Sequence, residues 1–290
     1  MSFSPTFSGF ARQPARVGTP EIKKDMPSFA PDSSVVSGVT PSPNFNARKD
    51  GRAPDMIVLH YTGTIDAQSA INRLTTAGTN VSAHYVVLED GSIIQCVKED
   101  QRAWHAGPSS WSGETDINSS SIGIEIVNGG HDLGYPDFAL RQVAAVIALC
   151  KGITLRRQIP KQRVLAHSDI APGRIKNPGE KFPWRLLAAS GVGHWVEPAP
   201  IVRSETRTLG ASGEQVLSLQ RALASYGYAV LPTGQYDGAT MDAVAAFQRH
   251  FRPERVDGIA DHSTLTTLRQ LIETLPKVTE AADFLHQFNF

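Results

Sequence analysis

Two histidines and one glutamate lie in, or at the ends of, apolar runs of this 290-residue sequence. His60 ends the run MIVLH, His167 ends VLAH, and Glu125 lies within SSIGIEIVN. Catalytic zinc sites commonly combine three imidazole or carboxylate ligands with a water molecule. The two imidazoles therefore predict part of a metal site. Its chemistry would be hydrolysis, because bound Zn²⁺ lowers the pKa of water to about 7.

Glu125 suits the role of a base better than that of a ligand. Alternation puts Ile122, Ile124 and Ile126 on one face of the strand and Glu125 on the other. A carboxylate fixed in this way can take a proton from the attacking water and return it to the leaving amine. The alternative interpretation is a buried, paired structural glutamate.

The elements that position these residues predict an α/β domain over residues 51–190. Strands are expected at MIVLHYT, SSIGIEIVN and RVLAH, and on both sides of Asp90-Gly91, a pair that favours a tight hairpin turn. Helices are expected after the cap residue Asp66 and over residues 139–153, where an apolar stripe begins at Leu140. This mixture predicts a mixed central β-sheet flanked by helices, with function in the loops that follow the strands.

A small all-α domain of three helices is expected over residues 207–275. Residues 191–206 are rich in Gly and Pro, as is typical of a linker. Ser212 and Gln215 predict a capping box for the first helix, and the second begins near Thr240. Asp-Gly pairs at 237–238 and 257–258, before the second and third helices, form a loose internal echo that two ordinary turns would also explain. The echo does not establish a solenoid repeat.

The composition excludes several classes of protein. Basic and acidic residues number 28 each, which does not favour a nucleic-acid partner. No run of about 18 apolar residues is present that would span a membrane. Cys96 and Cys150 provide no disulfide framework and are expected to be reduced and buried.

Both ends of the chain are expected to lie outside the two domains. Residues 1–50 are rich in Ser, Pro and Gly and predict a disordered extension, and residues 276–290 form a tail with no assigned function. The first segment lacks the apolar core of a secretory signal, which favours a cytoplasmic protein. A periplasmic location is the alternative.

Five segments, taken in order, carry a resemblance to a known family. They are IVLHYTGT, VSAHYVVLEDGSIIQCV, RAWHAG, NSSSIGIEIVN and LAHSDIAPGRIKNPGEKFPW. Together they resemble the zinc-dependent N-acetylmuramoyl-L-alanine amidases of the type 2 family, to which the peptidoglycan recognition proteins are related. The resemblance implies zinc held by two histidines and an aspartate, a glutamate base, and a lysine that stabilises the oxyanion. By position, His60 and His167 match the histidines and Glu125 matches the glutamate.

The third ligand and the lysine depart from the family pattern. The family's loop reads Gly-Arg-Lys-x-Asp-Pro-Gly, whereas residues 173–179 read GRIKNPG. Asn177 therefore stands at the aspartate position and Ile175 at the lysine position. Lys176 follows one residue later and would point the opposite way in an extended segment, unless a local twist returns it to the site. Asn177 as a metal ligand and Lys176 as a catalytic residue are the resulting candidates.

An amide ligand changes what the metal site is expected to do. Its oxygen brings no charge, and carbonyl donors suit Ca²⁺ or Mg²⁺ better than zinc, so zinc affinity should fall. The same loss of charge would leave the metal a stronger Lewis acid. Asp169 is a possible substitute ligand, although hydrogen bonding within its loop is the preferred interpretation.

Three further residues are candidates for substrate binding. Trp104 and His105, in RAWHAG, would line the substrate groove, and Arg174 would hold a substrate carboxylate through two hydrogen bonds. Packing roles and an ordinary surface arginine are the alternatives. Residues 207–275 resemble the three-helix peptidoglycan-binding module of wall hydrolases, which would tether the enzyme to its polymer.

The sequence thus predicts a zinc amidase that cuts between N-acetylmuramic acid and L-alanine, in peptidoglycan or in small anhydro-muropeptides. The main alternative is a binding protein. With asparagine at position 177 in place of the family's aspartate, the domain could be a weakened or inactive enzyme that only binds peptidoglycan fragments. A metal hydrolase acting on an unrelated amide is the third hypothesis. It would leave the helical module without a function.

Overall fold

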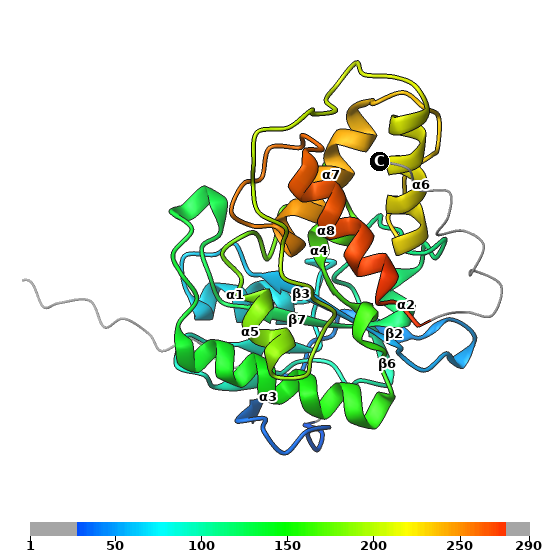
Figure 1. Ribbon diagram of the computed structural model, residues 1–290. Coiled ribbons are helices and arrows are strands. Elements are labelled where there is room, and N and C mark those ends of the chain that lie inside the picture. Colours follow the sequence, from blue (N-terminus) through cyan, green and yellow to red (C-terminus); the bar gives the residue numbers. More distant parts are fainter. Residues whose placement is uncertain (1–27, 277–290) are drawn as a thin grey trace, which may run out of the picture.

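The computed structural model describes residues 28–276 as a mixed sheet against which a helical unit packs (Figure 1). The sheet has the order β1-β5-β4-β7-β3-β8. Its strands are β1 (Gly38–Val39), β3 (Met56–Tyr61), β4 (Tyr85–Val87), β5 (Ile93–Gln95), β7 (Ser121–Ile126) and β8 (Val164–Ala166). β3 pairs in parallel with β7 and β8, while β4 and β5 form the predicted hairpin around Asp90-Gly91. The predicted fold class is confirmed.

Five helices accompany this sheet in the described part of the chain. They are α1 (Ala67–Thr75), α2 (Ile117–Ser120), α3 (Leu140–Arg157), α4 (His167–Ile170) and α5 (Trp184–Ala189). Asp66 caps α1 as predicted, because its side chain accepts a hydrogen bond from Ser69 N. The stripe of α3 is only partly as predicted: Leu140 is 82% exposed, and the buried face begins at Val143. The first turn still contacts the sheet, because the side chain of buried Gln142 donates to the carbonyl oxygens of Val87 and Val127.

The two faces of β3 bury different side chains because successive residues of a strand point to opposite sides. Ile57 and Leu59 pack in one core with α3, which lies below the sheet in Figure 1. Met56 and Val58 pack in a second core with the helical unit, above the sheet. His60 continues this second face, so it lies on the side of the helical unit.

Residues 28–50 contradict the predicted disordered extension. β1 pairs with β5 at the edge of the sheet, and β2 (Phe45–Ala47) pairs with β6 (Gln101–Ala103). The guanidinium of buried Arg48 donates to the carbonyl oxygens of Glu99 and Ser119. Backbone pairing and one buried cation hold this Ser- and Pro-rich segment in place. Neither interaction produces an apolar periodicity in the sequence, so the prediction missed both. Residues 1–27 and 277–290, which include most of the expected extension and tail, lie outside the described residues.

The helical unit contains α6 (Glu214–Tyr226), α7 (Gly238–Phe251) and α8 (His262–Glu273). Residues 191–206, which precede it, form neither helix nor strand. The predicted capping box at Ser212 is wrong: α6 begins after Gly213, and no side chain caps it. Ser212 instead forms an isolated β-bridge with Gln235.

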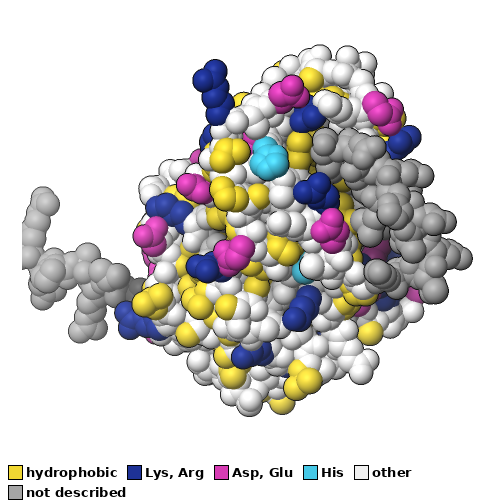
Figure 2. Space-filling view, viewed as in Figure 1, with side chains coloured by type: hydrophobic (Ala, Val, Ile, Leu, Met, Phe, Trp, Pro, Cys, Tyr) yellow, Lys and Arg dark blue, Asp and Glu magenta, His cyan; other side chains and the backbone are white. Residues whose placement is uncertain are grey.

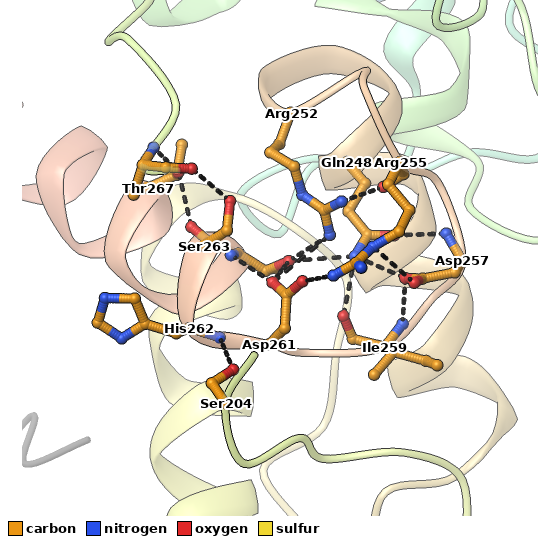
Figure 3. Close-up of polar contacts among 12 residues, drawn as sticks. Ser204, Gln248, Arg252, Arg255, Asp257, Ile259, Asp261, His262, Ser263 and Thr267 are labelled. Carbon is orange, nitrogen blue, oxygen red and sulfur yellow. Dashed lines mark hydrogen bonds and ion pairs between the residues drawn. The ribbon is translucent and has the colours of Figure 1, made fainter. Parts of the chain in front are cut away.

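The helical unit is built from an internal repeat that centres on two buried glutamines, Gln220 and Gln248. Each glutamine binds a glycine N–H, a loop carbonyl and a threonine hydroxyl. For Gln220 the partners are Gly234, Gln235 and Thr240. For Gln248, whose surroundings Figure 3 shows, they are Gly258, Ile259 and Thr264. The two sets of partners follow the same spacing along the chain. The two Asp-Gly pairs therefore lie within a real repeat, which the pairs alone did not establish.

The two Asp-Gly pairs nevertheless occupy different positions of the repeat. Asp237 caps α7 by accepting from Thr240 N, and Asp261 caps α8 by accepting from Thr264 N. Asp237 thus corresponds to Asp261 and not to Asp257. Asp257 instead accepts from the side chain of Gln248 in the loop before α8 (Figure 3).

Charges of both signs are spread over the visible face of the protein (Figure 2). On the face in Figure 2, basic and acidic side chains are interspersed, with no field of a single sign. None of the helices in residues 28–276 has the length and apolar character needed to cross a bilayer. Cys96 and Cys150 are both free and buried.

Gln248→Met should lower the free energy of unfolding by about 2–3 kcal/mol, because the N–H groups of Asp257 and Gly258 would lose their buried acceptor. Gln235→Ala is the matched control, since the side chain of Gln235 is exposed and its replacement should change stability by less than about 0.5 kcal/mol. Urea denaturation of both variants measures the difference. Equal stability of the two would contradict the assigned role of Gln248.

Candidate active site

A pocket of about 420 Å³ opens beyond the carboxyl ends of β3 and β7. It is lined by all of the predicted site residues except Lys176: His60, Trp104, His105, Glu125, His167, Arg174 and Asn177. The volume lies within the range of about 300–1,000 Å³ that small-molecule sites occupy. The fold therefore gathers at one place residues that are more than 100 positions apart in the sequence.

Strand register places Glu125 beside the first histidine. β3 and β7 pair so that His60 lies directly opposite Glu125. Both residues are on the strand face away from α3, as the alternation predicts. Two neighbouring parallel strands thus present an imidazole and a carboxyl group side by side to the pocket.

The two histidines face each other through their Nδ1 atoms, which are 2.9 Å apart. Nε2 of His167 is 3.0 Å from the carbonyl oxygen of Ala106. A carbonyl can only accept, so neutral His167 carries its proton on Nε2, and its Nδ1 lone pair is directed at His60. Nε2 of His60 is 3.1 Å from Nδ1 of His105.

Burial keeps these imidazoles neutral. It lowers the pKa of His167 to about 4, and the charge of Arg174 contributes to this shift. Burial, with repulsion from His167 and His105, places the pKa of His60 well below its usual value. Neutral imidazole is the form that binds a metal, so both side chains are ready as ligands at pH 7.

Glu125 has the properties of a proton carrier. Its Oε2 atom is buried and is without a hydrogen-bond partner among the described residues. Burial raises the pKa of the Glu125 carboxyl to about 8. A carboxyl that titrates near neutral pH can both accept and return a proton, which general acid-base catalysis requires. The alternative of a paired structural glutamate receives no support from these contacts.

Asn177 contributes its side-chain amide to the lining of the pocket. Its Oδ1 atom is buried and also has no hydrogen-bond partner in the described part of the chain. Its backbone oxygen accepts from Ser168 N, which ties Asn177 to the turn that begins at His167. Two imidazole nitrogens and one amide oxygen fit a divalent cation. Residues 28–276 contain no group of three or more His, Cys, Asp or Glu side chains placed to hold a metal ion.

Asp169 is not placed as a substitute ligand. Its carboxylate accepts hydrogen bonds from Ala166 N and from the side chains of Tyr228 and His250. The predicted bonding within the loop is thus present, but two of the three donors come from the helical unit. No sequence pattern links these residues, since Tyr228 and His250 lie far along the chain.

Lys176 does not reach the pocket. Its side chain is exposed, whereas its neighbours Ile175 and Asn177 line the pocket. Ile175 also packs against the core of the helical unit. Side chains of consecutive residues alternate here, and no local twist returns Lys176 to the site.

Arg174 lines the pocket and binds the loop of Ala106 and Pro108. Its Nη2 atom donates to the carbonyl oxygens of Ala106 and Pro108, each at 2.8 Å, and is 3.4 Å from Nε2 of His167. This guanidinium therefore fixes the loop that also binds His167.

Trp104 and His105 line the pocket from the loop after β6. Trp104 donates through Nε1 to Asn46, and His105 contacts both His60 and Ser121. The ring of His105 occupies the space beside Gly123, where a Cβ atom would overlap it. Glycine at this position of β7 therefore makes room for His105.

Sequence reasoning missed Asn118 and Arg73. Asn118 accepts through Oδ1 from the N–H groups of His105 and Ala106, and so shapes the loop that receives His167. Arg73 lines the pocket from α1. For Asn118, its position just before a strand was the one feature of the sequence that could have indicated a role. Arg73 lies on the exposed face of a helix, where an arginine indicates no particular role.

The fold and this pocket, which gathers two imidazoles, a carboxyl group and an amide, define a hydrolase. A profile of the N-acetylmuramoyl-L-alanine amidases matches residues 50–180, and one described as a putative peptidoglycan binding domain matches residues 212–268. N-acetylmuramoyl-L-alanine amidase AmiD of Escherichia coli is 36% identical over 230 residues, which cover 75% of this chain and 82% of that protein. The chain belongs to the N-acetylmuramoyl-L-alanine amidase family.

Other relatives agree with this assignment. The 1,6-anhydro-N-acetylmuramyl-L-alanine amidase AmpD of Escherichia coli is 37% identical over 161 residues, which cover 50% of this chain and 86% of that one. The solved complex of AmiD with anhydro-N-acetylmuramic acid-L-Ala-D-gamma-Glu-L-Lys superposes with a TM-score of 0.66 at 34% identity, covering 79% of this chain and 92% of that one. AmpDh3 of Pseudomonas aeruginosa gives a TM-score of 0.65 at 32% identity, with coverages of 80% and 96%.

The metal-free protein should lose stability as the pH falls from 6.5 towards 4. Burial lowers the pKa of His84 to about 3, and its Nδ1 atom accepts from Gly123 N in β7. The unfolded protein therefore takes up protons below pH 6.5 that the folded protein excludes. Each such histidine makes the free energy of unfolding fall by about 1.4 kcal/mol per pH unit.

Urea denaturation between pH 6.5 and 5, with chelator present, tests this slope. His84→Gln should reduce it by about 1.4 kcal/mol per pH unit, since one excluded proton is removed. The carboxyl groups titrate mainly below this window. An unchanged slope in the variant would show that His84 does not remain neutral in the fold.

Proposed function

We propose that this amidase uses a zinc ion held by His60, His167 and Asn177 to hydrolyse the amide bond between N-acetylmuramic acid and L-alanine. The observation that carries the proposal is the convergence of two Nδ1 atoms, 2.9 Å apart, beside an unpartnered buried amide oxygen and the unpartnered carboxyl of Glu125. Two nitrogens bound to one tetrahedral zinc lie about 3.3 Å apart. The histidine pair is close to that spacing.

Zinc, when bound, would polarise the scissile carbonyl and make water acidic enough to attack at neutral pH. The residues of the chain perform the proton transfers. Glu125 accepts a proton from the attacking water and delivers it to the departing nitrogen of L-alanine. His105, bonded to Nε2 of His60, fixes the orientation of that imidazole.

The pocket suits an anionic muropeptide. Arg73 and Arg174 line it on two sides, and the stem peptides of peptidoglycan carry carboxylates that these cations attract. A relative crystallised with an anhydro-muramyl peptide supports the same class of substrate. The helical unit would keep the enzyme at its polymer and so raise the effective substrate concentration.

Glu125→Gln tests the proposed base. The variant should fold and bind zinc as the parent does, while kcat for stem-peptide release falls by about 10²- to 10⁴-fold, because no group remains to move the proton. Liquid chromatography of muropeptide digests measures the release. Glu89→Gln, which neutralises an exposed carboxylate near the hairpin turn, should leave kcat unchanged.

Activity that survives both Glu125→Gln and chelation would refute the proposed chemistry. Fragment binding without zinc and without hydrolysis would instead identify a receptor, the alternative that the Asn177 position raises.

Asn177→Asp should tighten zinc binding by at least about tenfold, because it gives the third ligand a negative charge. Competition with a chromogenic chelator measures the dissociation constant. Asn80→Asp provides the control, since it adds the same charge at an exposed position of the pocket rim. An equal gain in both variants would mean that Asn177 acts only through the general field and is not a ligand.

A further inference from the structure

The carboxylate of Asp169 joins the two parts of the protein. It is fully buried and lies in α4, the short turn that begins at His167. Its Oδ2 atom accepts from Ala166 N at 2.8 Å and from Nδ1 of His250 at 2.6 Å. Its Oδ1 atom accepts from the hydroxyl of Tyr228 at 2.7 Å. The helical unit thus supplies both side-chain donors.

Neither donor can reorient without opening the core. His250, in α7, is 2% exposed. Its ring stacks on those of Trp184 and Phe251, with ring centroids 3.7 Å and 3.8 Å apart. Tyr228, which follows α6, is also 2% exposed and packs edge-on against Trp111. Aromatic packing therefore fixes the directions from which Asp169 is held.

The turn held by Asp169 carries two of the proposed ligands. His167 is its first residue, and the bond from Ala166 N to Asp169 closes the turn around it. Ser168 N donates to the backbone oxygen of Asn177 at 3.0 Å. A shift of this turn would therefore move His167 and Asn177 together.

We propose that Asp169 is a positioning residue for the metal site and that Tyr228 and His250 of the helical unit hold it in place. The helical unit then completes the catalytic site, in addition to any role as a tether. This inference rests on the proposed function, because it concerns the same ligands. Asp169 acts through the backbone of the His167 turn and does not touch the reacting atoms.

The energetics favour such a role. A buried carboxylate that loses a donor must find another partner or move towards water, since an unsatisfied buried charge is strongly destabilising. The path to water would displace the turn. Groups that orient metal ligands typically change metal affinity by about 10- to 100-fold when they are removed.

Variants of the full-length chain separate positioning from stability. Tyr228→Phe and His250→Phe each remove one donor and keep an aromatic ring, whereas His250→Asn keeps a donor near the position of Nδ1. The control is His194→Ala, which removes two bonds to the helical unit, to Tyr226 and Thr274, neither of which is made to Asp169. The readouts are the thermal midpoint, the zinc dissociation constant from chelator competition, and kcat on a soluble muropeptide, for which tethering is irrelevant.

The expected result is a zinc dissociation constant raised by about 10- to 100-fold and a lowered kcat in Tyr228→Phe and His250→Phe. His250→Asn should recover most of both losses. His194→Ala should lower the thermal midpoint and leave zinc affinity and kcat at parental values. A purely structural contact would lower the thermal midpoint alone and would not change zinc affinity or kcat.

The inference is overturned if the two donor variants lower the thermal midpoint as His194→Ala does while zinc affinity and kcat stay parental. Should His250→Phe not fold, Tyr228→Phe carries the comparison. Failure of the proposed function is distinguishable, because the parent protein itself would then bind no zinc. In that case kcat on the soluble muropeptide alone decides between positioning and stability.

Discussion

The parallel pairing of β3 with β7 is the constraint on which the rest of the site depends. It sets His60 opposite Glu125 and at the same time sets Leu59 opposite Ile124 in the core against α3. A slip of β7 by one residue would turn Glu125 into the α3 core and bring an isoleucine to the pocket beside His60. The burial of the isoleucines and leucines therefore also fixes the geometry of the polar groups.

The surroundings of the site then set its protonation. One face of the sheet is covered by α3 and the other in part by the helical unit, so His60 and His167 lie in a region with little water. Desolvation favours neutral forms: it lowers the pKa of both imidazoles and raises the pKa of Glu125. A cation entering this pocket would meet unprotonated nitrogens and would favour ionisation of the carboxyl.

Local patterns predicted much of this arrangement. The alternation around Glu125, the Asp90-Gly91 turn and the cap at Asp66 are each encoded within a few residues, and all are present in the structure. The pairing of residues 28–50 with the sheet could not be read in this way, because backbone groups make it. The two side chains that donate to Asp169, those of Tyr228 and His250, lie 59 and 81 positions away, and no local pattern could identify them. The spacing in the sequence placed Lys176 beside the site, but the alternation of side chains turns it outward.

The duplicated construction of the helical unit leads to an asymmetry. The two copies share their glutamine, loop and cap, yet their outer surfaces have different neighbours. Asp242 on α7 lies against Gly173 in the loop that carries Asn177, whereas its counterpart on α8, Thr266, borders an open cavity of about 210 Å³. The first copy is thereby coupled to the active-site loop, whereas the equivalent position of the second copy faces a cavity that opens to solvent.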